Sequence, residues 1–378
     1  MARLFGRDWS KSELMRHVGN VDQLGGARRI MLVEGNEAGS EAVLFRNGAG
    51  LNFIAVAGRG LDITSAEYCG QSLCWRSQTG DTAAPYFEPD GLGWLRGFFG
   101  GLVATCGITY AGAPHTDPDT DEGEPHWDAD QGKWLSTGSM GLHGRINNTP
   151  AKNLYVDGAW EGDDYVFWAQ GKMREGKVFG PNILLTRRVT GKLGVNKIWF
   201  HDVVTNEGHK PQEHMFLYHV NLGFPLIQAN SRYLVNSRES KPRDADAAPH
   251  FDTWDQFPAP TPDQVEWVYY HDLATAADGT TMVGFANSVQ EGGAMGLYLK
   301  YDKSALPYFI EWKMPAEGTY VTGLEPANCL VEGRAKDRRE GRLEVLRPGQ
   351  EKVYDLEIGL LTTADEVVAV ADEIKSMK

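Results

Sequence analysis

The sequence predicts an all-β fold, an antiparallel β-sandwich with only a few short helices. Segments rich in Val, Ile, Phe, Tyr and Trp recur along most of the 378 residues. Clusters of Gly, Asn, Asp and Pro separate these segments, as turns do between antiparallel strands. No helical pattern alternates with the strands, which argues against a doubly wound parallel sheet.

The elements follow in order along the chain. Ser10 and Glu13 have capping-box spacing, which predicts a short helix near the N-terminus. Strands then dominate, and the last of them places Tyr354 on one face and Asp355 on the other. The segment "ADEVVAVADEIKSMK" predicts a C-terminal helical tail. The clearest strand segments are "RRIMLVE", "EAVLFRN", "LNFIAVAG", "YVFWAQGKM", "NILLTRRVT", "KIWFHDVVTNEG", "MVGFANS", "GLYLKYD", "YFIEWKM" and "KVYDLEIGLL".

The segment "FLYHVNLGFPLI", residues 216–227, places a histidine inside a strand pattern. Because strand side chains alternate between faces, one face carries large apolar groups and the other turns polar and small. The apolar face comprises Phe216, Tyr218, Val220, Leu222 and Phe224; the other comprises Leu217, His219, Asn221 and Gly223.

Composition and charge limit the class of protein. A 42% hydrophobic and 23% charged composition is typical of a globular protein, and the net charge of -14 disfavours nucleic acid and anionic membranes as partners. Four cysteines without a CxxC pair, no apolar run of membrane length and no signal-peptide pattern predict a cytoplasmic protein. We expect one domain over residues 1–378, with its core at about 25–360 and two long loops.

Four segments contain candidate functional residues. Arg96 lies in a Gly-rich run, and "GLHGR" places His143 and Arg145 two positions apart, on one face if the segment is extended. His219 lies in the strand above, and "EWKMPAEGTYVTGLEPAN" contains Lys313 and Glu325. A strand histidine is more often structural, and cations are more often at the surface. Glu325, however, shares its predicted face with a valine and a glycine, where a carboxylate needs a partner or a function.

Several metal and nucleotide motifs fail on inspection. "GLGWLRG" has the wrong spacing for a nucleotide-binding loop, and no helix pattern follows it. "DPDTDEG" resembles a calcium loop, but its glycine is one position late and Asp128 stands where a glutamate is required. His115 and His126 flank this acidic run, so a metal site stays open as the weaker alternative to a solvated loop. We predict no metal.

In their chain order, "RGFFGG", "HGR", "YHVNLGFP" and "GLEPAN" resemble the aldose 1-epimerase, or galactose mutarotase-like, superfamily over residues 25 to 360. The similarity is greatest to a bacterial branch that carries a domain of unknown function. The resemblance implies a large antiparallel β-supersandwich with a sugar bound in an open cleft on the concave face of one sheet. Gly223 would then leave room for the sugar ring, and Asn221, beside it, would bind the substrate.

The resemblance also implies residue roles. His219 would be the general acid and Glu325 the general base of sugar ring opening, without metal or organic cofactor. Arg96 and His143 would bind hydroxyls near the reacting end, with Arg145 as a weaker candidate. If His219 and Glu325 lie on opposite sides of one cleft, about one sugar ring apart, catalysis is favoured; if His219 is buried with a fixed backbone partner, a structural role is favoured.

Two departures from the family pattern leave alternatives open. Lys313 adds a cation, which in the cleft would bind an acidic or phosphorylated sugar or stabilise an enediolate. The loop with Arg243 and Asp244 would close over the cleft, where Arg243 would bind the substrate. The first interpretation is an aldose 1-epimerase; a second is an epimerase, isomerase or eliminating enzyme on a keto sugar or sugar acid; a third is a non-catalytic carbohydrate-binding protein. The expected partner is a small sugar, with a homodimer left open.

Overall fold

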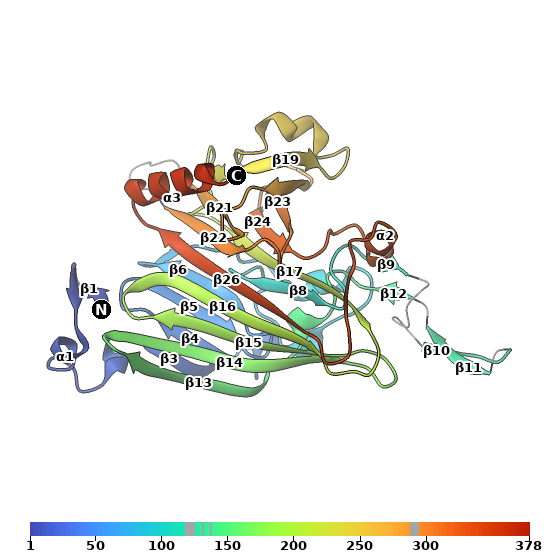
Figure 1. Cartoon of the computed structure of the whole chain (residues 1–378), viewed down its shortest axis with the longest axis horizontal. Coiled ribbons are helices and arrows are strands. Elements are labelled where there is room, and N and C mark those ends of the chain that lie inside the picture. Colours follow the sequence, from blue (N-terminus) through green and yellow to red (C-terminus); the bar gives the residue numbers. More distant parts are fainter. Residues whose placement is uncertain (118–124, 131, 137, 288–294) are drawn as a thin grey trace.

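Three antiparallel sheets build the protein, as the sequence predicts. A computed structural model describes residues 1–117, 125–130, 132–136, 138–287 and 295–378 (Figure 1). The first sheet has five strands in the order β3 (Gly26–Met31), β4 (Glu41–Arg46), β5 (Leu51–Val56), β6 (Asp62–Tyr68), β7 (Gln71–Ser72).

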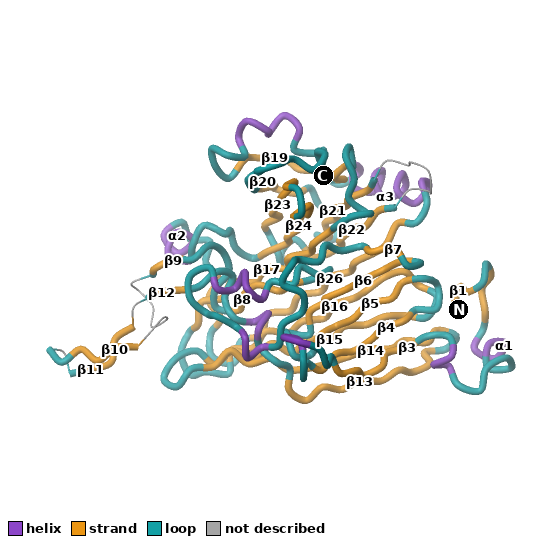
Figure 2. Tube along the Cα trace, turned by 180° about the vertical axis from the view of Figure 1, so that it is seen from behind, coloured by secondary structure: helices purple, strands orange, loops and turns teal. Residues whose placement is uncertain are grey.

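The second sheet has eight strands and is the longest layer of the molecule. It contains the chain-consecutive strands β13 to β16 and then β26, which arrives from near the C-terminus (Figures 1 and 2). The order is β13 (Lys152–Glu161), β14 (Asp164–Gly176), β15 (Asn182–Lys192), β16 (Val195–Asn206), β26 (Glu351–Leu361), β22 (Gly296–Asp302), β21 (Thr280–Ala286), β18 (Arg232–Leu234).

The third sheet carries four of the candidate functional residues, His219, Asn221, Lys313 and Glu325. It has seven strands, of which β8 (Ala104–Ile108) pairs only with β17. The others run in the order β19 (Ser237–Pro242), β20 (Trp267–Leu273), β23 (Tyr308–Ala316), β24 (Thr319–Ala327), β17 (Gln212–Leu222), β25 (Glu344–Leu346). Three two-stranded pairs complete the strands: β1 (Ala2–Leu4) with β2 (Arg7–Trp9), β9 (His115–Thr116) with β12 (Ser139–Met140), and β10 (Pro125–Asp128) with β11 (Lys133–Ser136).

The helices are short and peripheral. The predicted N-terminal helix is confirmed as α1 (Lys11–Leu14), with a Ser10–Glu13 capping box, and the C-terminal one as α3 (Ala364–Ser376), with a Thr363–Glu366 box. The third is α2 (Arg334–Arg339). The 3-10 turns are η1 (Val21–Gln23), η2 (Gly35–Glu37), η3 (Ala84–Tyr86), η4 (Gly93–Gly97), η5 (Ile146–Asn148) and η6 (Ala248–Thr253). No helix among the described ranges is long and apolar enough to cross a membrane.

Strand β17 separates two apolar clusters, which explains its alternating pattern. Phe216, Tyr218 and Val220 belong to the main core between the sheets, whereas Leu217 belongs to a second cluster beneath the candidate site. The predicted alternation is therefore confirmed for this strand. It ends at Leu222, so Phe224 lies beyond it and is 70% exposed rather than packed in the sandwich.

Candidate active site

A cleft of about 260 Å³ lies on the face of the third sheet opposite the main core. His219 comes from β17, Glu325 from β24 and Trp312 from β23, so three neighbouring strands form its floor. The segment around η4 and the loop before β20 supply its walls. The lining residues are Leu92, Trp94, Leu95, Phe98, Ala113, Pro114, Leu142, His143, His219, Arg243, Glu266, Val268, Ile310, Trp312, Glu325 and Val331.

His219 and Glu325 meet in this cleft. Their strands pair with Val220 opposite Leu324, which places the two side chains on one face. The Nε2 of His219 lies 3.2 Å from the Oε1 of Glu325, within ion-pair distance but not aligned as a hydrogen bond. The separation of about one sugar ring, which would have favoured catalysis, is therefore not found. The anomeric oxygen and the ring oxygen of a sugar are bonded to the same carbon, so a base and an acid that serve them lie close together.

Burial shifts the protonation of both groups. Burial raises the pKa of the Glu325 carboxyl well above its usual range; nearby Glu266 adds to the rise and Arg243 opposes it. Burial likewise lowers the pKa of His219 to about 3, and His143 adds to the fall. The raised pKa of Glu325 and the lowered pKa of His219 together favour one acidic proton shared by the pair, residing on the carboxyl of Glu325. Moving this proton to His219 yields the carboxylate and imidazolium that general acid–base chemistry requires.

His143 adds a neutral hydrogen-bond donor to the cleft. Its ring lies 5.9 Å from that of His219 and 4.9 Å from that of Trp94, between centroids. Its Nδ1 accepts a hydrogen bond from the backbone N–H of Gly112 at 3.3 Å, and burial lowers its pKa to about 4. A neutral imidazole with Nδ1 accepting carries its proton on Nε2. His143 therefore suits a sugar hydroxyl oxygen.

Arg243 and Glu266 form one polar wall. The Arg243 guanidinium contacts Glu266 at 2.9 Å and Asp244 at 2.7 Å, and the Trp312 indole N–H donates to the other Glu266 oxygen at 2.8 Å. Arg243 thus lies in the cleft, but two carboxylates balance its charge. The wall presents fixed hydrogen-bonding groups rather than an unpaired cation.

The structure places Arg96 outside this cleft. The η4 turn buries Trp94 and directs Arg96 to solvent, where its side chain is 75% exposed and pairs with Glu88 at 3.2 Å. Its neighbours Trp94, Leu95 and Phe98 line the cleft instead. The Gly-rich segment therefore contributes apolar surface, not the predicted cation.

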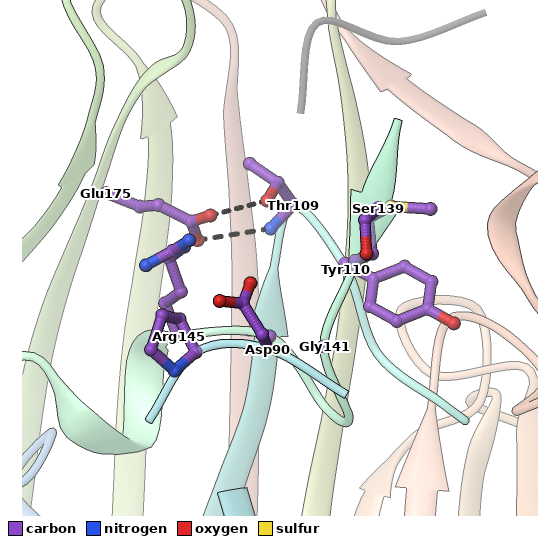
Figure 3. Close-up of a pocket in the computed structure, with 10 residues that line it drawn as sticks. Asp90, Thr109, Tyr110, Ser139, Gly141, Arg145 and Glu175 are labelled. Atoms are coloured by element: carbon purple, nitrogen blue, oxygen red, sulfur yellow. Dashed lines mark hydrogen bonds between the residues drawn. The ribbon is translucent and has the colours of Figure 1, made fainter. Parts of the chain in front are cut away.

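Arg145 lies in a different, much smaller pocket with Asp90, Thr109 and Glu175 (Figure 3). This pocket has about 20 Å³ of space, room for about one water. His143 and Arg145 do not share a face because the segment is not extended: φ is +56° at His143 and +73° at Gly144. This turn sends the two side chains into separate pockets.

Lys313 belongs to a buried network behind the sheet rather than to the cleft. Its Nζ lies 3.1 Å from Glu311 and donates to the backbone carbonyls of Gln256, at 2.8 Å, and Trp254. Glu311 also contacts Nε2 of His271 at 3.3 Å. Strand alternation explains the placement, since Trp312, between Glu311 and Lys313, faces the cleft. The expected role of Lys313 in binding an acidic sugar or an enediolate is contradicted.

Asn221, in β17, and Gly223, just after it, have structural roles. Asn221 is buried and donates to the carbonyls of His219, at 3.0 Å, and Gly100, at 3.3 Å, so it holds the backbone beside His219 and does not line the cleft. A Cβ at Gly223 would lie 2.5 Å from the Cα of Trp75. Gly223 therefore makes room for a crossing backbone, not for a sugar ring.

Gly323 determines whether the acid–base pair fits. A Cβ there would lie 2.4 Å from Oε1 of Glu325 and 3.1 Å from Cε1 of His219. We expect Gly323→Ala to displace both groups and to lower kcat/KM by between about ten- and a hundredfold, since small misplacements are costly in catalysis. The measurement is sugar anomer exchange by NMR. Gly19→Ala, where no atom lies within 4 Å of the added Cβ, is the matched control. If the Gly323→Ala variant had the same kcat/KM as the wild type, the close contact of position 323 with Glu325 and His219 would be contradicted.

No group of three or more His, Cys, Asp or Glu side chains among the described residues is placed to hold a metal ion. His115 is described, but most of the acidic run that follows it, residues 118–124, lies outside the described residues. The side chain of His126 is also outside them, so that alternative from the sequence remains untested.

Sequence reasoning missed the aromatic and acidic residues around the pair: Trp94, Phe98, Trp312 and Glu266. The ring of His219 lies 5.4 Å from that of Phe98 and 5.2 Å from that of Trp312. The position of Trp312 follows from the register of β23 against β24, which the sequence alone does not give. Ile310 pairs opposite Glu325 on the neighbouring strand, so two-residue alternation places Trp312 on the same face as Glu325.

The sheets and the cleft define a galactose mutarotase-like β-sandwich protein. The chain belongs to the DUF4432 family, a domain of unknown function, whose model matches residues 37–360. A candidate aldose 1-epimerase from Klebsiella pneumoniae has a TM-score of 0.83 with this chain at 25% identity, over 95% of this chain and 90% of its own. No curated protein sequence matches.

Two more distant structures share the fold. A galactose mutarotase-like protein from Clostridium acetobutylicum has a TM-score of 0.57 at 11% identity, over 90% of this chain and 100% of its own. A galactose 1-epimerase from Lactobacillus acidophilus has a TM-score of 0.51 at 11% identity, over 90% and 99%. At these identities, the likeness concerns the fold alone.

Proposed function

We propose that this protein is a carbohydrate-modifying enzyme, an aldose 1-epimerase that interconverts the anomers of a reducing sugar. The observation that carries the proposal is the contact of His219 with Glu325 at 3.2 Å in a cleft lined by aromatic rings. The fold that this chain shares with the candidate aldose 1-epimerase from Klebsiella pneumoniae supports a carbohydrate-modifying enzyme in general. Aromatic faces and neutral donors suit a sugar ring.

The reaction uses the single proton that the pair holds. With that proton on His219, the Glu325 carboxylate takes the proton of the anomeric hydroxyl while His219 protonates the ring oxygen. The bond between the anomeric carbon and the ring oxygen breaks, and the anomeric carbon becomes a carbonyl. Rotation of the carbonyl and reversal of both transfers close the ring as the other anomer. Each positioned proton-transfer group contributes about 10²–10⁴-fold.

The cleft favours a neutral sugar. Its described lining contains one cation, Arg243, which Asp244 and Glu266 already balance. Lys313, which would have supported an acidic or phosphorylated substrate, lies behind the sheet in the Glu311 network. Because Lys313 is not in the cleft, it cannot stabilise an enediolate there. No observation therefore favours an isomerase or eliminating enzyme over a mutarotase.

A non-catalytic sugar-binding protein would use the aromatic rings but has no need of an acid–base pair. Exchange NMR on a panel of free sugars, sugar acids and keto sugars separates the two. We expect faster anomer exchange of at least one neutral aldose than in buffer. Binding without any acceleration across the panel would refute the enzymatic proposal and leave the binding protein.

The remaining expectations stay predictions. A single domain, a cytoplasmic location, a small sugar as partner and a possible homodimer come from the sequence. The net charge of -14 still disfavours nucleic acid as a partner.

A further inference from the structure

Part of the acid–base cleft is lined by aliphatic side chains that the proposed reaction does not use. They belong to Leu92, Leu95, Pro114, Leu142 and Val331, and we call these five residues the aliphatic wall. Leu92 and Leu95 are 61% and 46% exposed. Large apolar side chains exposed together at a binding cleft gain free energy when an apolar part of a ligand covers them.

Backbone hydrogen bonds join the segments that carry the aliphatic wall. The N–H of Leu142 donates to the carbonyl of Gly91 at 2.9 Å, and the N–H of the next residue donates to the carbonyl of Gly112 at 2.8 Å. The N–H of Ala113 donates to the carbonyl of Val331 at 3.4 Å. The five side chains therefore form one continuous surface rather than scattered contacts.

The aliphatic wall offers few hydrogen-bonding groups to a sugar hydroxyl. Its side chains contain no polar atom, and Pro114 has no backbone N–H. The N–H of Leu95 already donates to the carbonyl of Leu92 at 3.0 Å, and the N–H of Leu142 is used in the bond described above. A hydroxyl packed against this surface therefore loses water without gaining a partner, whereas a methyl group does not.

The strand order determines which part of a sugar meets this surface. At Leu217, β17 pairs with β24 on one side and with β8 on the other. Glu325, on β24, therefore lies to one side of His219. The chain that leads into β8 lies to the other side, and it contains Phe98, whose ring centroid is 5.4 Å from that of His219. Phe98 stacks at 4.4 Å on Trp94 of η4, the turn that also contains Leu95.

In the proposed reaction Glu325 serves the anomeric oxygen and His219 the ring oxygen. The ring oxygen of a hexopyranose joins carbon 1 to carbon 5, and carbon 5 bears carbon 6. With carbon 1 toward Glu325, carbons 5 and 6 lie on the side of Phe98 and the aliphatic wall. The polar groups of Arg243 and Glu266, by contrast, lie beside Trp312 on the far side of β24.

We propose that the substrate is a 6-deoxyaldose, a reducing hexose whose carbon 6 is a methyl group instead of a hydroxymethyl group. The methyl group covers the aliphatic wall, and ring hydroxyls meet His143, Arg243 and Glu266. This inference rests on the proposed function, because it names the substrate class of the same cleft. A hydroxymethyl group in this place leaves its hydroxyl without a partner.

Matched pairs of sugars that differ only at carbon 6 test the proposal. The pairs are D-fucose with D-galactose, 6-deoxy-D-glucose with D-glucose, L-rhamnose with L-mannose, and L-fucose with L-galactose. Exchange NMR gives kcat/KM for each sugar after subtraction of the rate in buffer. In at least one pair we expect kcat/KM to be about tenfold or more higher for the 6-deoxy sugar, as apolar pockets discriminate. Equal values, or higher values for the hydroxylated sugar, in every pair that exchanges would overturn the proposal.

Two variants test whether the aliphatic wall causes this preference. Leu92→Gln and Leu95→Gln place an amide beside carbon 6, and both positions are exposed enough for the fold to tolerate the change. We expect each variant to move the ratio of the two kcat/KM values toward one. Val368→Gln, on α3 and 59% exposed, is the matched control and should keep the wild-type ratio. A preference that both leucine variants retain would overturn the role of the wall.

Failure of the proposed function is recognised separately. If the wild type accelerates anomer exchange of no sugar in these pairs, the mutarotase is refuted, and calorimetric titration of the same pairs then tests the substrate class. A 6-deoxy sugar that binds about tenfold more tightly than its partner, with the difference lost in Leu95→Gln, would keep the inference as a binding preference. Equal binding within every pair, or no binding of any sugar, would overturn it.

Discussion

Replacing Glu325 with Gln is expected to slow anomer exchange by about 10²–10⁴-fold, the contribution of one positioned proton-transfer group. The amide cannot take the proton of the anomeric hydroxyl. It can still fill the same volume, and because burial raises the pKa of Glu325, the site favours a neutral group at this position. The free energy of unfolding should therefore change little. Exchange NMR gives the rate, and thermal unfolding followed by circular dichroism gives the stability.

Glu357→Gln is the matched control for this substitution. Glu357 lies on β26 in the eight-stranded sheet and pairs with Lys197 at 2.8 Å, away from the cleft. We expect its exchange rate to equal that of the wild type. A Glu325→Gln protein that folds and exchanges anomers at the wild-type rate would exclude Glu325 as the base.

The same pair fixes the sign of the pH dependence. The reactive form holds one proton. At low pH a second proton enters near the pKa of His219, about 3, which leaves no base. At high pH the proton leaves as the raised pKa of Glu325 is passed, which leaves no acid. For the wild type we expect kcat/KM to stay level where an ordinary glutamate would titrate, and to fall at higher pH as the raised pKa of Glu325 is passed.

Replacing Lys313 with Met is expected to lower the free energy of unfolding by about 3–5 kcal/mol, as removal of one partner of a buried ion pair does. Lys313 is 1% exposed, and its loss leaves Glu311 and His271 facing each other in the interior. It also frees the carbonyls of Trp254 and Gln256, which Lys313 holds. Urea unfolding, read from the midpoint at constant slope, measures the loss.

Lys300→Met provides the comparison, since Lys300 is 41% exposed and pairs with Glu373 at 3.5 Å. Such surface pairs contribute about 0–1 kcal/mol. If the two lysine variants were equally stable, the buried network would not hold the sheet to the loop beneath it. A double substitution of Lys313 and Glu311 by Met should recover part of the loss, because it removes the unpaired charge as well.

What could be predicted from the sequence was local. Two-residue alternation identified the two faces of β17, and capping boxes at Ser10 and Thr363 mark the starts of α1 and α3. The resemblance brought His219 and Glu325 together correctly. These features depend on a strand or a turn and its own side chains, and the pairing of β17 with β24 then places the two residues on one face.

What could not be predicted depended on which segments meet. Alternation alone separates Trp312 from Lys313, but the register of β23 against β24 decides which of them faces the cleft. From the sequence, the small side chain of Gly223 suggested space for a ligand. In the fold the backbone of Trp75, distant in sequence, fills that space. The left-handed turn at His143 separated it from Arg145; Gly144 permits this turn, but a glycine there does not by itself predict a left-handed histidine. Each wrong prediction therefore involved a tertiary contact or a backbone conformation that the strand pattern does not encode.

The most direct measurement is proton NMR of sugar anomer exchange in D₂O, with wild type and Glu325→Gln side by side. Anomer exchange that the wild type accelerates, that Glu325→Gln loses, and that leaves every carbon-bound proton in place would establish proton transfer at oxygen by this pair. Deuterium entering at carbon would instead show isomerase chemistry. Acceleration that survives in Glu325→Gln would contradict the assignment of Glu325 as the base.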